Sequence, residues 1–195
     1  MKTTRLVAMA AVAGASLCAG QSAEVPQATV TVCMESDPHV LTGVQPLASE
    51  MFAGIGVRID WRDRKSCPAG VGAIQVRLSY DPPKFSALAF AQPYQGTIVV
   101  FPDRVQELSR KGGPSLVAHV LVHEITHVVE GISRHSATGI MKARWDDNDY
   151  CEMRRKPLDF AQEDVDLIYA GLKARQARAA PAVTAAVSAG AVAGH

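Results

Sequence analysis

The sequence predicts an α/β (or α+β) domain in which helices pack on a β-sheet. Strand-like and helix-like segments are mixed along the chain. The strand-like segments are short and have β-branched residues at alternate positions, and the helix-like segments have apolar residues at helical spacing. In the middle of the chain, a Pro-Tyr-Gln-Gly turn at residues 93–96 separates two strand candidates and predicts a hairpin.

The expected elements follow from the local patterns, taken in order along the chain. Strands are expected at Ala28–Cys33, Val57–Trp61, Ile74–Leu78, Leu88–Ala91 and Thr97–Phe101. Helices are expected at Pro46–Ile55, Pro114–Glu130 and Glu163–Leu172. The second helix has the clearest boundaries, because Pro114 suits a first helical turn and Gly131 suits a helix end.

Length and composition narrow the class of protein. A chain of 195 residues, 48% hydrophobic and 20% charged, fits one globular domain and excludes a disordered polyelectrolyte, a collagen and a multi-span membrane protein. With 20 Lys and Arg against 19 Asp and Glu, the chain lacks the basic excess of a nucleic-acid-binding protein. We therefore expect no nucleic-acid partner.

Both ends differ in composition from the middle. Residues 1–20 have the pattern of a signal peptide, with a basic start at Lys2 and Arg5, an apolar run and small residues at the end. They predict a secreted or periplasmic protein without stable membrane insertion; a lipoprotein or an uncleaved anchor is the alternative. Residues 174–195 contain ten alanines and predict a disordered tail. The domain is therefore expected over residues 28–173.

Three cysteines remain once the signal peptide is removed: Cys33, Cys67 and Cys151. An exported protein meets oxidants, so one disulfide with one free thiol left over is expected. We favour the pair Cys33–Cys67, because both lie outside the segment that carries the chemistry described next. Three buried free thiols are the alternative.

Residues 123–127 read His-Glu-Ile-Thr-His. On a helix, His123 and His127 face the same way and can bind one metal ion, whereas Glu124 lies about 100° round the helix and can reach a water on that metal. The helix turns its aliphatic residues to another face, and a chance match has a probability on the order of 1%. Zinc suits such a donor set when one coordination position stays open for water. The alternative is two partly exposed histidines on a polar face.

A third ligand is needed, and the residues offer two. His135 lies beyond Gly131, whose conformational freedom can turn the chain back toward the metal. Glu130 is on the same helix as His127, but three ligands on one straight helix converge poorly. His119 has the same difficulty and is better interpreted as a packed histidine. His135 is the favoured ligand, with Glu130 as its rival.

The run from His123 to Met141 resembles the metzincin clan of zinc endopeptidases, especially the matrixin-like ones. That clan has H-E-x-x-H-x-x-G-x-x-H followed by a turn that contains a methionine. The resemblance implies that His123, His127 and His135 bind Zn²⁺, that Glu124 is the catalytic general base, and that Met141 forms an apolar floor. The intervals on either side of Gly131 are each one residue longer than in the clan, and the interval from His135 to Met141 is shorter than in typical matrixins.

Two further segments extend the resemblance. Residues 88–103 are similar to the edge strand, bulge and following strand of matrixins, and residues 160–171 are similar to their last helix. The implied architecture is a twisted, mostly parallel sheet with an antiparallel edge strand, an active-site helix and a C-terminal helix. The implied function is that of a secreted or periplasmic zinc endopeptidase. It would act as a monomer on a peptide or protein substrate extended along Leu88–Ala91.

Other functions stay open at this stage. The site could belong to a zinc hydrolase of non-peptide amides, or to a non-catalytic, zinc-stabilised binding module of the cell envelope. Glu124 speaks against the binding module, because a purely structural zinc site has no use for a general base. The acidic residues 146–149 could invite calcium, but they lack the Gly and distal Glu of a helix–loop–helix site, and a solvated loop is favoured.

Overall fold

The computed structural model describes residues 28–34, 43–68, 72–81 and 87–191. Its sheet has the strand order β2-β1-β3-β5-β4, in which β1–β2, β1–β3 and β3–β5 are parallel pairs and β4 pairs with β5 antiparallel. The strands are β1 (Ala28–Met34), β2 (Val57–Asp63), β3 (Ile74–Leu78), β4 (Ala89–Gln92) and β5 (Thr97–Val100). This confirms the α/β architecture with a mostly parallel sheet and an antiparallel edge strand. The expected signal peptide lies outside the described residues.

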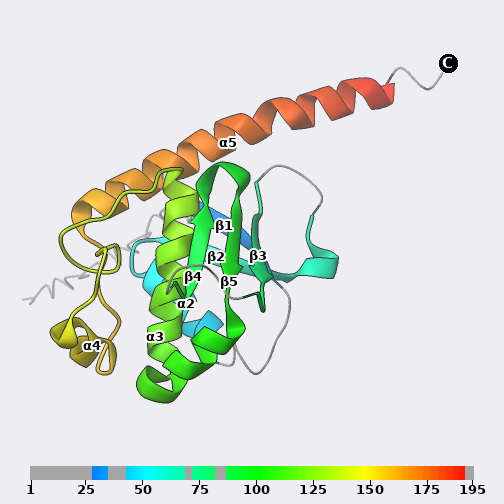
Figure 1. Ribbon diagram of the computed structural model, residues 1–195. Helices are drawn as coiled ribbons and strands as arrows, with labels where there is room; N and C mark the ends of the chain where they lie inside the picture. The colour runs from blue at the N-terminus through cyan, green and yellow to red at the C-terminus, as the bar shows by residue number, and fades with distance from the viewer. Residues whose placement is uncertain (1–27, 35–42, 69–71, 82–86, 192–195) are drawn as a thin grey trace, which may run out of the picture.

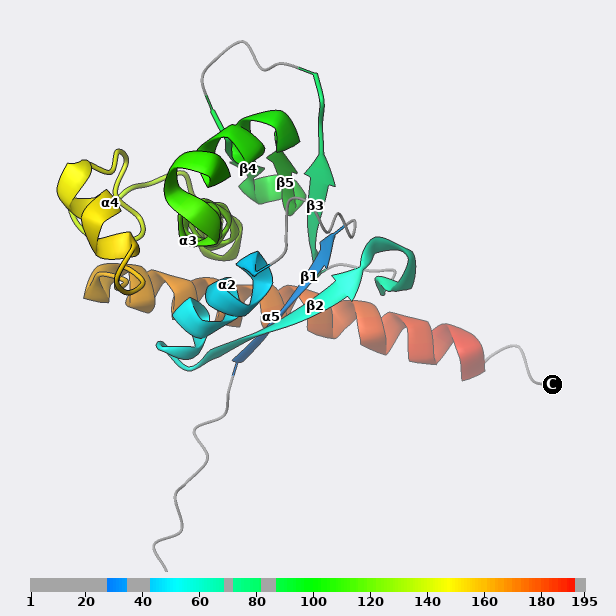
Figure 2. The same ribbon diagram turned by 90° about the horizontal axis from the view of Figure 1, so that it is seen from below.

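Four α-helices accompany the sheet in the described part of the chain. They are α2 (Val44–Ala53), α3 (Pro102–Glu130), α4 (Asp147–Met153) and α5 (Gln162–Ala191). The 3₁₀ turns η1 (Arg64–Ser66) and η2 (Pro93–Gln95) follow β2 and β4. Figures 1 and 2 show α2 and α3 side by side next to the sheet, with α4 beyond α3 and α5 running across one end of the strands. Of the described helices, none combines the length and apolar character needed to cross a membrane.

The aliphatic face of α3 forms much of the core, as its sequence predicts. Its buried members are Val117, Ala118, Leu121, Val122, Ile125, Val128 and Val129. Leu116 and Val120, on the side of the histidines, are buried as well. They belong to the same cluster as the sheet residues Val30, Val32, Ile74, Val76 and Ile98. Burial of this face fixes the rotation of the helix about its axis. It therefore also fixes the direction of the polar residues on the remaining face.

Two glycines set the limits of the functional part of α3. Gly113 has φ 70° and ψ −173°, so it interrupts the helix just before Pro114, where the sequence predicted the helix to begin. The helical turns from Pro102 to this kink were not predicted. Gly131 has φ 74° and its N–H donates to the carbonyl of His127 at 3.0 Å, which ends the helix where expected.

The last helix is longer than expected. The sequence predicted a helix at Glu163–Leu172 and a disordered tail from Ala174, whereas α5 continues as a helix to Ala191 and runs past the body of the molecule in Figure 1. Alanine, the best helix former, dominates this segment, and this explains why the helix continues. At Gly171, α5 comes so close to α3 that a Cβ would collide with the carbonyl of Val129.

The acidic segment at residues 146–149 is not the solvated loop that we expected. Asp146 caps the N-terminus of α4 and forms a capping box with Asp149. Lys142 forms ion pairs with both carboxylates, each at 2.6 Å. These carboxylates therefore start a helix and neutralise a lysine.

A disulfide joins Cys33 on β1 to Cys67 after η1, with 5.8 Å between the two Cα atoms. Cys151 is a free, exposed thiol. The favoured pairing is confirmed, and the alternative of three free thiols is wrong. The bond ties the segment after β2 to β1, an inner strand of the sheet.

Candidate metal centre

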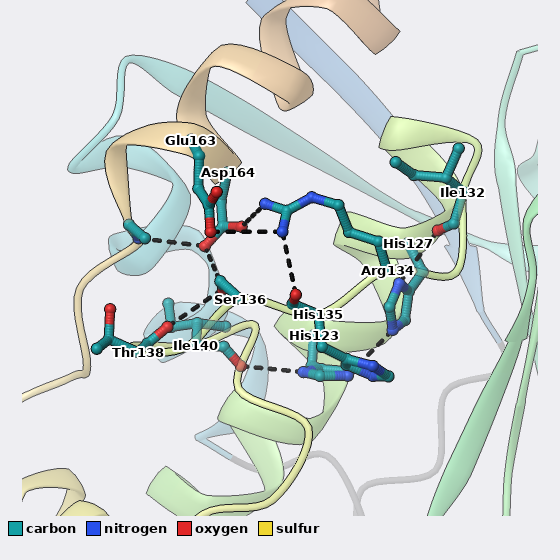
Figure 3. Close-up of polar contacts among 11 residues, drawn as sticks. His123, His127, Ile132, Arg134, His135, Ser136, Thr138, Ile140, Glu163 and Asp164 are labelled. Atoms are coloured by element: carbon teal, nitrogen blue, oxygen red, sulfur yellow. Dashed lines mark hydrogen bonds and ion pairs between the residues drawn. The ribbon is translucent and has the colours of Figure 1, made fainter.

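Three histidines meet at the C-terminal end of α3. Each of His123, His127 and His135 offers one ring nitrogen, and these nitrogens lie within 4.8 Å of one another. His127 is buried and His135 is exposed. Two of the three come from α3 and the third from the loop beyond Gly131, as expected from the sequence. Figure 3 shows their rings gathered around one point.

The hydrogen bonds of His123 and His127 leave the Nε2 atoms of both rings without protons. Nδ1 of His123 lies 2.9 Å from the carbonyl of Ile140, and Nδ1 of His127 lies 3.2 Å from the carbonyl of Ile132. A carbonyl oxygen only accepts hydrogen bonds, so both Nδ1 atoms must donate. In the neutral imidazoles the Nε2 atoms then carry lone pairs, and they face each other at 3.1 Å. Two lone pairs that converge in this way fit a shared cation.

Burial keeps these rings neutral. Burial first, and then the neighbouring His123 and His135, lower the pKa of His127 to about 4. The pKa of His123 is also lowered, mainly by burial. A neutral imidazole is the form that binds a metal ion. The pair on α3 is therefore ready to bind a metal at neutral pH without first losing protons.

The third histidine is held in place by its loop. The N–H of Ser136 donates to the carbonyl of Met141 at 2.9 Å, which closes the loop behind His135. The ring centre of His135 lies 5.2 Å from that of His123 and 5.0 Å from that of His127. Met141 is buried, as an apolar floor requires, and its neighbour Ile140 accepts the hydrogen bond from His123.

Asp164, in the first turn of α5, fastens this loop to the rest of the protein. Its side chain is fully buried and accepts hydrogen bonds from Arg134 at 2.6 Å and from the hydroxyl of Ser136 at 2.9 Å. Arg134 also donates to the carbonyl of His135 at 3.1 Å. Both neighbours of His135 are thus bound to one carboxylate, and Figure 3 shows this arrangement on the far side of the loop from the imidazoles.

The rival ligand, Glu130, does not belong to the group. Both of its carboxylate oxygens are buried without a hydrogen-bond partner within the described structure. Burial raises the pKa of this carboxyl to about 7, although the charge of Arg134 counteracts the effect. Of the described acidic and histidine side chains, only the three histidines converge into a possible metal site.

Glu124 follows His123 on α3 and lines a cleft together with it. The N–H of Ala91 on the edge strand β4 donates to its carboxylate, and burial raises the pKa of this carboxyl to about 7. The cleft has a volume of about 510 Å³. Its lining consists of His123, Glu124, Val120, Leu88, Ala89, the segment 142–145 and Tyr150. Glu124 is thus turned toward the space in which a water and a substrate could lie, and it is not part of the histidine group.

His119 is a packed histidine, as expected. It is fully buried, its Nδ1 donates to the carbonyl of Ser115 at 2.7 Å, and its Nε2 accepts from the N–H of Leu158 at 2.9 Å. Burial lowers its pKa. Both ring nitrogens are occupied, so this imidazole has no nitrogen left for a metal.

Two residues of the site had no role assigned from the sequence: Trp145, which lies near the motif, and Asp164. The ring centre of Trp145 lies 5.8 Å from that of His123, with the two rings nearly perpendicular, and its indole N–H donates to the carbonyl of Gly139. Asp164 looked like an ordinary acidic residue in the first turn of a helix. Neither had a signal in its local pattern, because both reach the site through the tertiary fold.

Comparisons with known proteins find a similar fold among solved structures. No protein-family model matches the chain, and no curated protein matches it. Among solved structures, an archaemetzincin from Methanopyrus kandleri is similar, with a TM-score of 0.54 and 15% identity over 76% of this chain and 99% of that one. An archaemetzincin from Archaeoglobus fulgidus, complexed with malonate, gives a TM-score of 0.44 and 14% identity over 71% of this chain and 99% of that one. The chain therefore shares its fold with the Methanopyrus kandleri protein.

Proposed function

We propose that this protein is a zinc-dependent peptidase of the metzincin type. The observation that carries the proposal is the pair of unprotonated Nε2 atoms of His123 and His127, with His135 completing the group beside Glu124. Three neutral imidazoles with one open position are a usual donor set for catalytic zinc. The shared fold with the Methanopyrus kandleri archaemetzincin supports the proposal.

The zinc ion and the side chains of the protein would contribute different steps to peptide hydrolysis. Zinc, when bound, acts as a Lewis acid that polarises a carbonyl group and lowers the pKa of a water to about 7. Glu124 takes a proton from the attacking water and delivers it to the leaving amine. The N–H of Ala91 orients the Glu124 carboxylate toward the cleft. Trp145 packs against the ring of His123 and lines the same cleft.

The edge strand β4 positions the substrate. Leu88 accepts a hydrogen bond from Phe101 next to β5, whereas Ala91 turns its N–H away from β5 toward Glu124. Backbone groups alternate in direction along a strand, so Ala89 faces the cleft as Ala91 does. An extended peptide that adds to this edge would bring its backbone alongside the general base. This arrangement favours cleavage within a chain, hence an endopeptidase.

We also propose that the protein is exported, to the periplasm or the medium, and acts as a monomer. The pattern of residues 1–20 and the Cys33–Cys67 disulfide support export, because structural disulfides are rare in reducing compartments. Within the metzincins, the run from His123 to Met141 most resembles the matrixin-like members.

The proposal is tested with purified mature protein in three steps. Elemental analysis after reconstitution should find about one zinc per chain. A mixed peptide library should then give new termini by mass spectrometry, and a chelator should abolish them until zinc is restored. Zinc without any peptide cleavage would favour the binding module. Zinc together with cleavage of small acyl-amides, but not of peptides, would favour a hydrolase of non-peptide amides.

A further inference from the structure

The cleft beside Glu124 extends along one side of α3. It begins at His123 and Glu124, passes Val120 one turn earlier on the helix, and is bordered by Leu88 and Ala89 on the strand side. The opposite wall is the segment 142–145 together with Tyr150 of α4. A substrate side chain next to the bond being cut would therefore lie between the strand and this wall.

The wall carries two cationic side chains, Lys142 and Arg144, which differ in their ion pairs. Lys142 is paired with Asp146 and Asp149, both at 2.6 Å, so its charge is neutralised. Arg144 is exposed, lines the cleft, and has no ion pair or side-chain hydrogen bond within the described part of the chain. The acidic residue in the cleft lining is Glu124, which belongs to the catalytic end. The guanidinium of Arg144 thus lines the cleft without a partner among the described residues.

We propose that Arg144 selects substrates with an acidic side chain, Asp or Glu, at a fixed position beside the scissile bond. The proposal rests on the proposed peptidase function and names the class of peptide that the site prefers. A guanidinium presents a planar fork of donors that matches a carboxylate in two parallel hydrogen bonds. The apolar stem of the acidic side chain would lie against Leu88, Trp145 and Tyr150, which border the same cleft.

The size of the preference follows from exposure. A single ion pair in contact with solvent changes an equilibrium by roughly two- to five-fold, and the effect weakens as salt is added. Reversal of the charge at position 144 replaces attraction with repulsion. If the repulsion is as large as the attraction, the ratio of kcat/KM for acidic over amide peptides should fall by roughly 4- to 25-fold.

The experiment uses sets of peptides that are identical except for one position near the cleavage site. At that position they carry Asp, Asn, Glu, Gln or Lys. Wild type, Arg144→Gln and Arg144→Glu are compared by the ratio of kcat/KM for acidic and amide peptides. Arg155→Glu is the matched control, because Arg155 is exposed at the end of α4 and does not line the cleft.

The expected result is a two- to five-fold preference of wild type for the acidic peptides, which Arg144→Gln removes and Arg144→Glu reverses in favour of Lys. Arg155→Glu should keep the wild-type ratio. Wild-type cleavage without any acidic preference, or an equal change of the ratio in Arg155→Glu, would overturn the role of Arg144 while leaving the peptidase function intact.

A separate measurement covers failure of the peptidase function itself. If the zinc-loaded wild type cleaves no peptide, binding of the same fluorescent peptides is measured by anisotropy. Tighter binding of the Asp and Glu peptides that is lost in Arg144→Glu supports the acidic selectivity of the cleft in a binding module. Equal or absent binding of all peptides overturns it.

Discussion

The two parts of the metal centre are built by different forces. His123, Glu124 and His127 stand on a helix whose rotation is fixed by a buried aliphatic face. His135 stands on an irregular loop that is held by hydrogen bonds and an ion pair to Asp164. Apolar packing is non-directional and spread over many residues, whereas the loop depends on one buried carboxylate. The helical part should therefore tolerate single substitutions of its supporting residues, and the loop part should not.

The largest effect is expected on the helical part, at Glu124. Glu124→Gln keeps the shape and one acceptor but cannot take a proton. Peptide hydrolysis should fall by roughly 10²–10⁴-fold, while zinc content and thermal stability stay at wild-type level. Activity and zinc are measured on the same preparation. Equal cleavage by the variant and the wild type would show that the activity comes from elsewhere.

The loop part is tested first at the ligand itself. His135→Ala removes one of three imidazoles, so zinc affinity should fall by more than the roughly 10–100-fold typical of losing an outer hydrogen-bond partner. Glu130→Gln, on the helix, should keep the zinc. Competition with a chromophoric chelator measures both affinities. Loss of zinc in Glu130→Gln with retention in His135→Ala would reverse the ligand assignment.

The support of the loop is tested at Asp164. Asp164→Asn keeps the size of the side chain but leaves Arg134 without its buried counter-charge. The free energy of unfolding should fall by about 3 kcal/mol, and zinc affinity should fall by roughly 10–100-fold. The substitution should displace His135 more than His123 and His127. The absorption spectrum of the cobalt-substituted variant should therefore differ from that of the cobalt-substituted wild type. Asp166→Asn, an exposed position on the same helix, is the control. Zinc binding by Asp164→Asn equal to wild type would contradict the argument.

The same contrast explains what the sequence could predict. The histidine motif on α3 and the strands were predictable, because the spacing of metal ligands and the periodicity of apolar residues are patterns within a single helix or strand. The turn at Gly131 was predictable from its conformational freedom. The roles of Asp164 and Trp145 were not, because only the tertiary fold brings these side chains to the histidines and their loop. The continuation of α5 was missed, since the alanine-rich segment was interpreted as disorder although alanine favours helix.

The smallest effect concerns Glu130, the helical carboxyl that does not join the site. Burial raises its pKa to about 7, well above the ordinary value of 4.5. Between these two values the folded state binds more protons than the unfolded state, so this carboxyl stabilises the fold at low pH and loses that contribution as the pH rises through 7. Glu130 is only half-buried and solvent screens part of this effect, so wild type should lose on the order of 1 kcal/mol between pH 5 and pH 8 from this group.

Glu130→Gln cannot titrate and should lack that loss. Its melting temperature relative to wild type should rise from pH 5 to pH 8, measured on metal-free protein by calorimetry. Comparison of one variant with wild type at each pH cancels the titration of all other groups. A difference that stays constant with pH would mean that the Glu130 carboxylate finds a partner when it is charged. A difference that grows would show that the helix carries an unpaired buried acid one turn from the metal centre, sustained by the packing of α3.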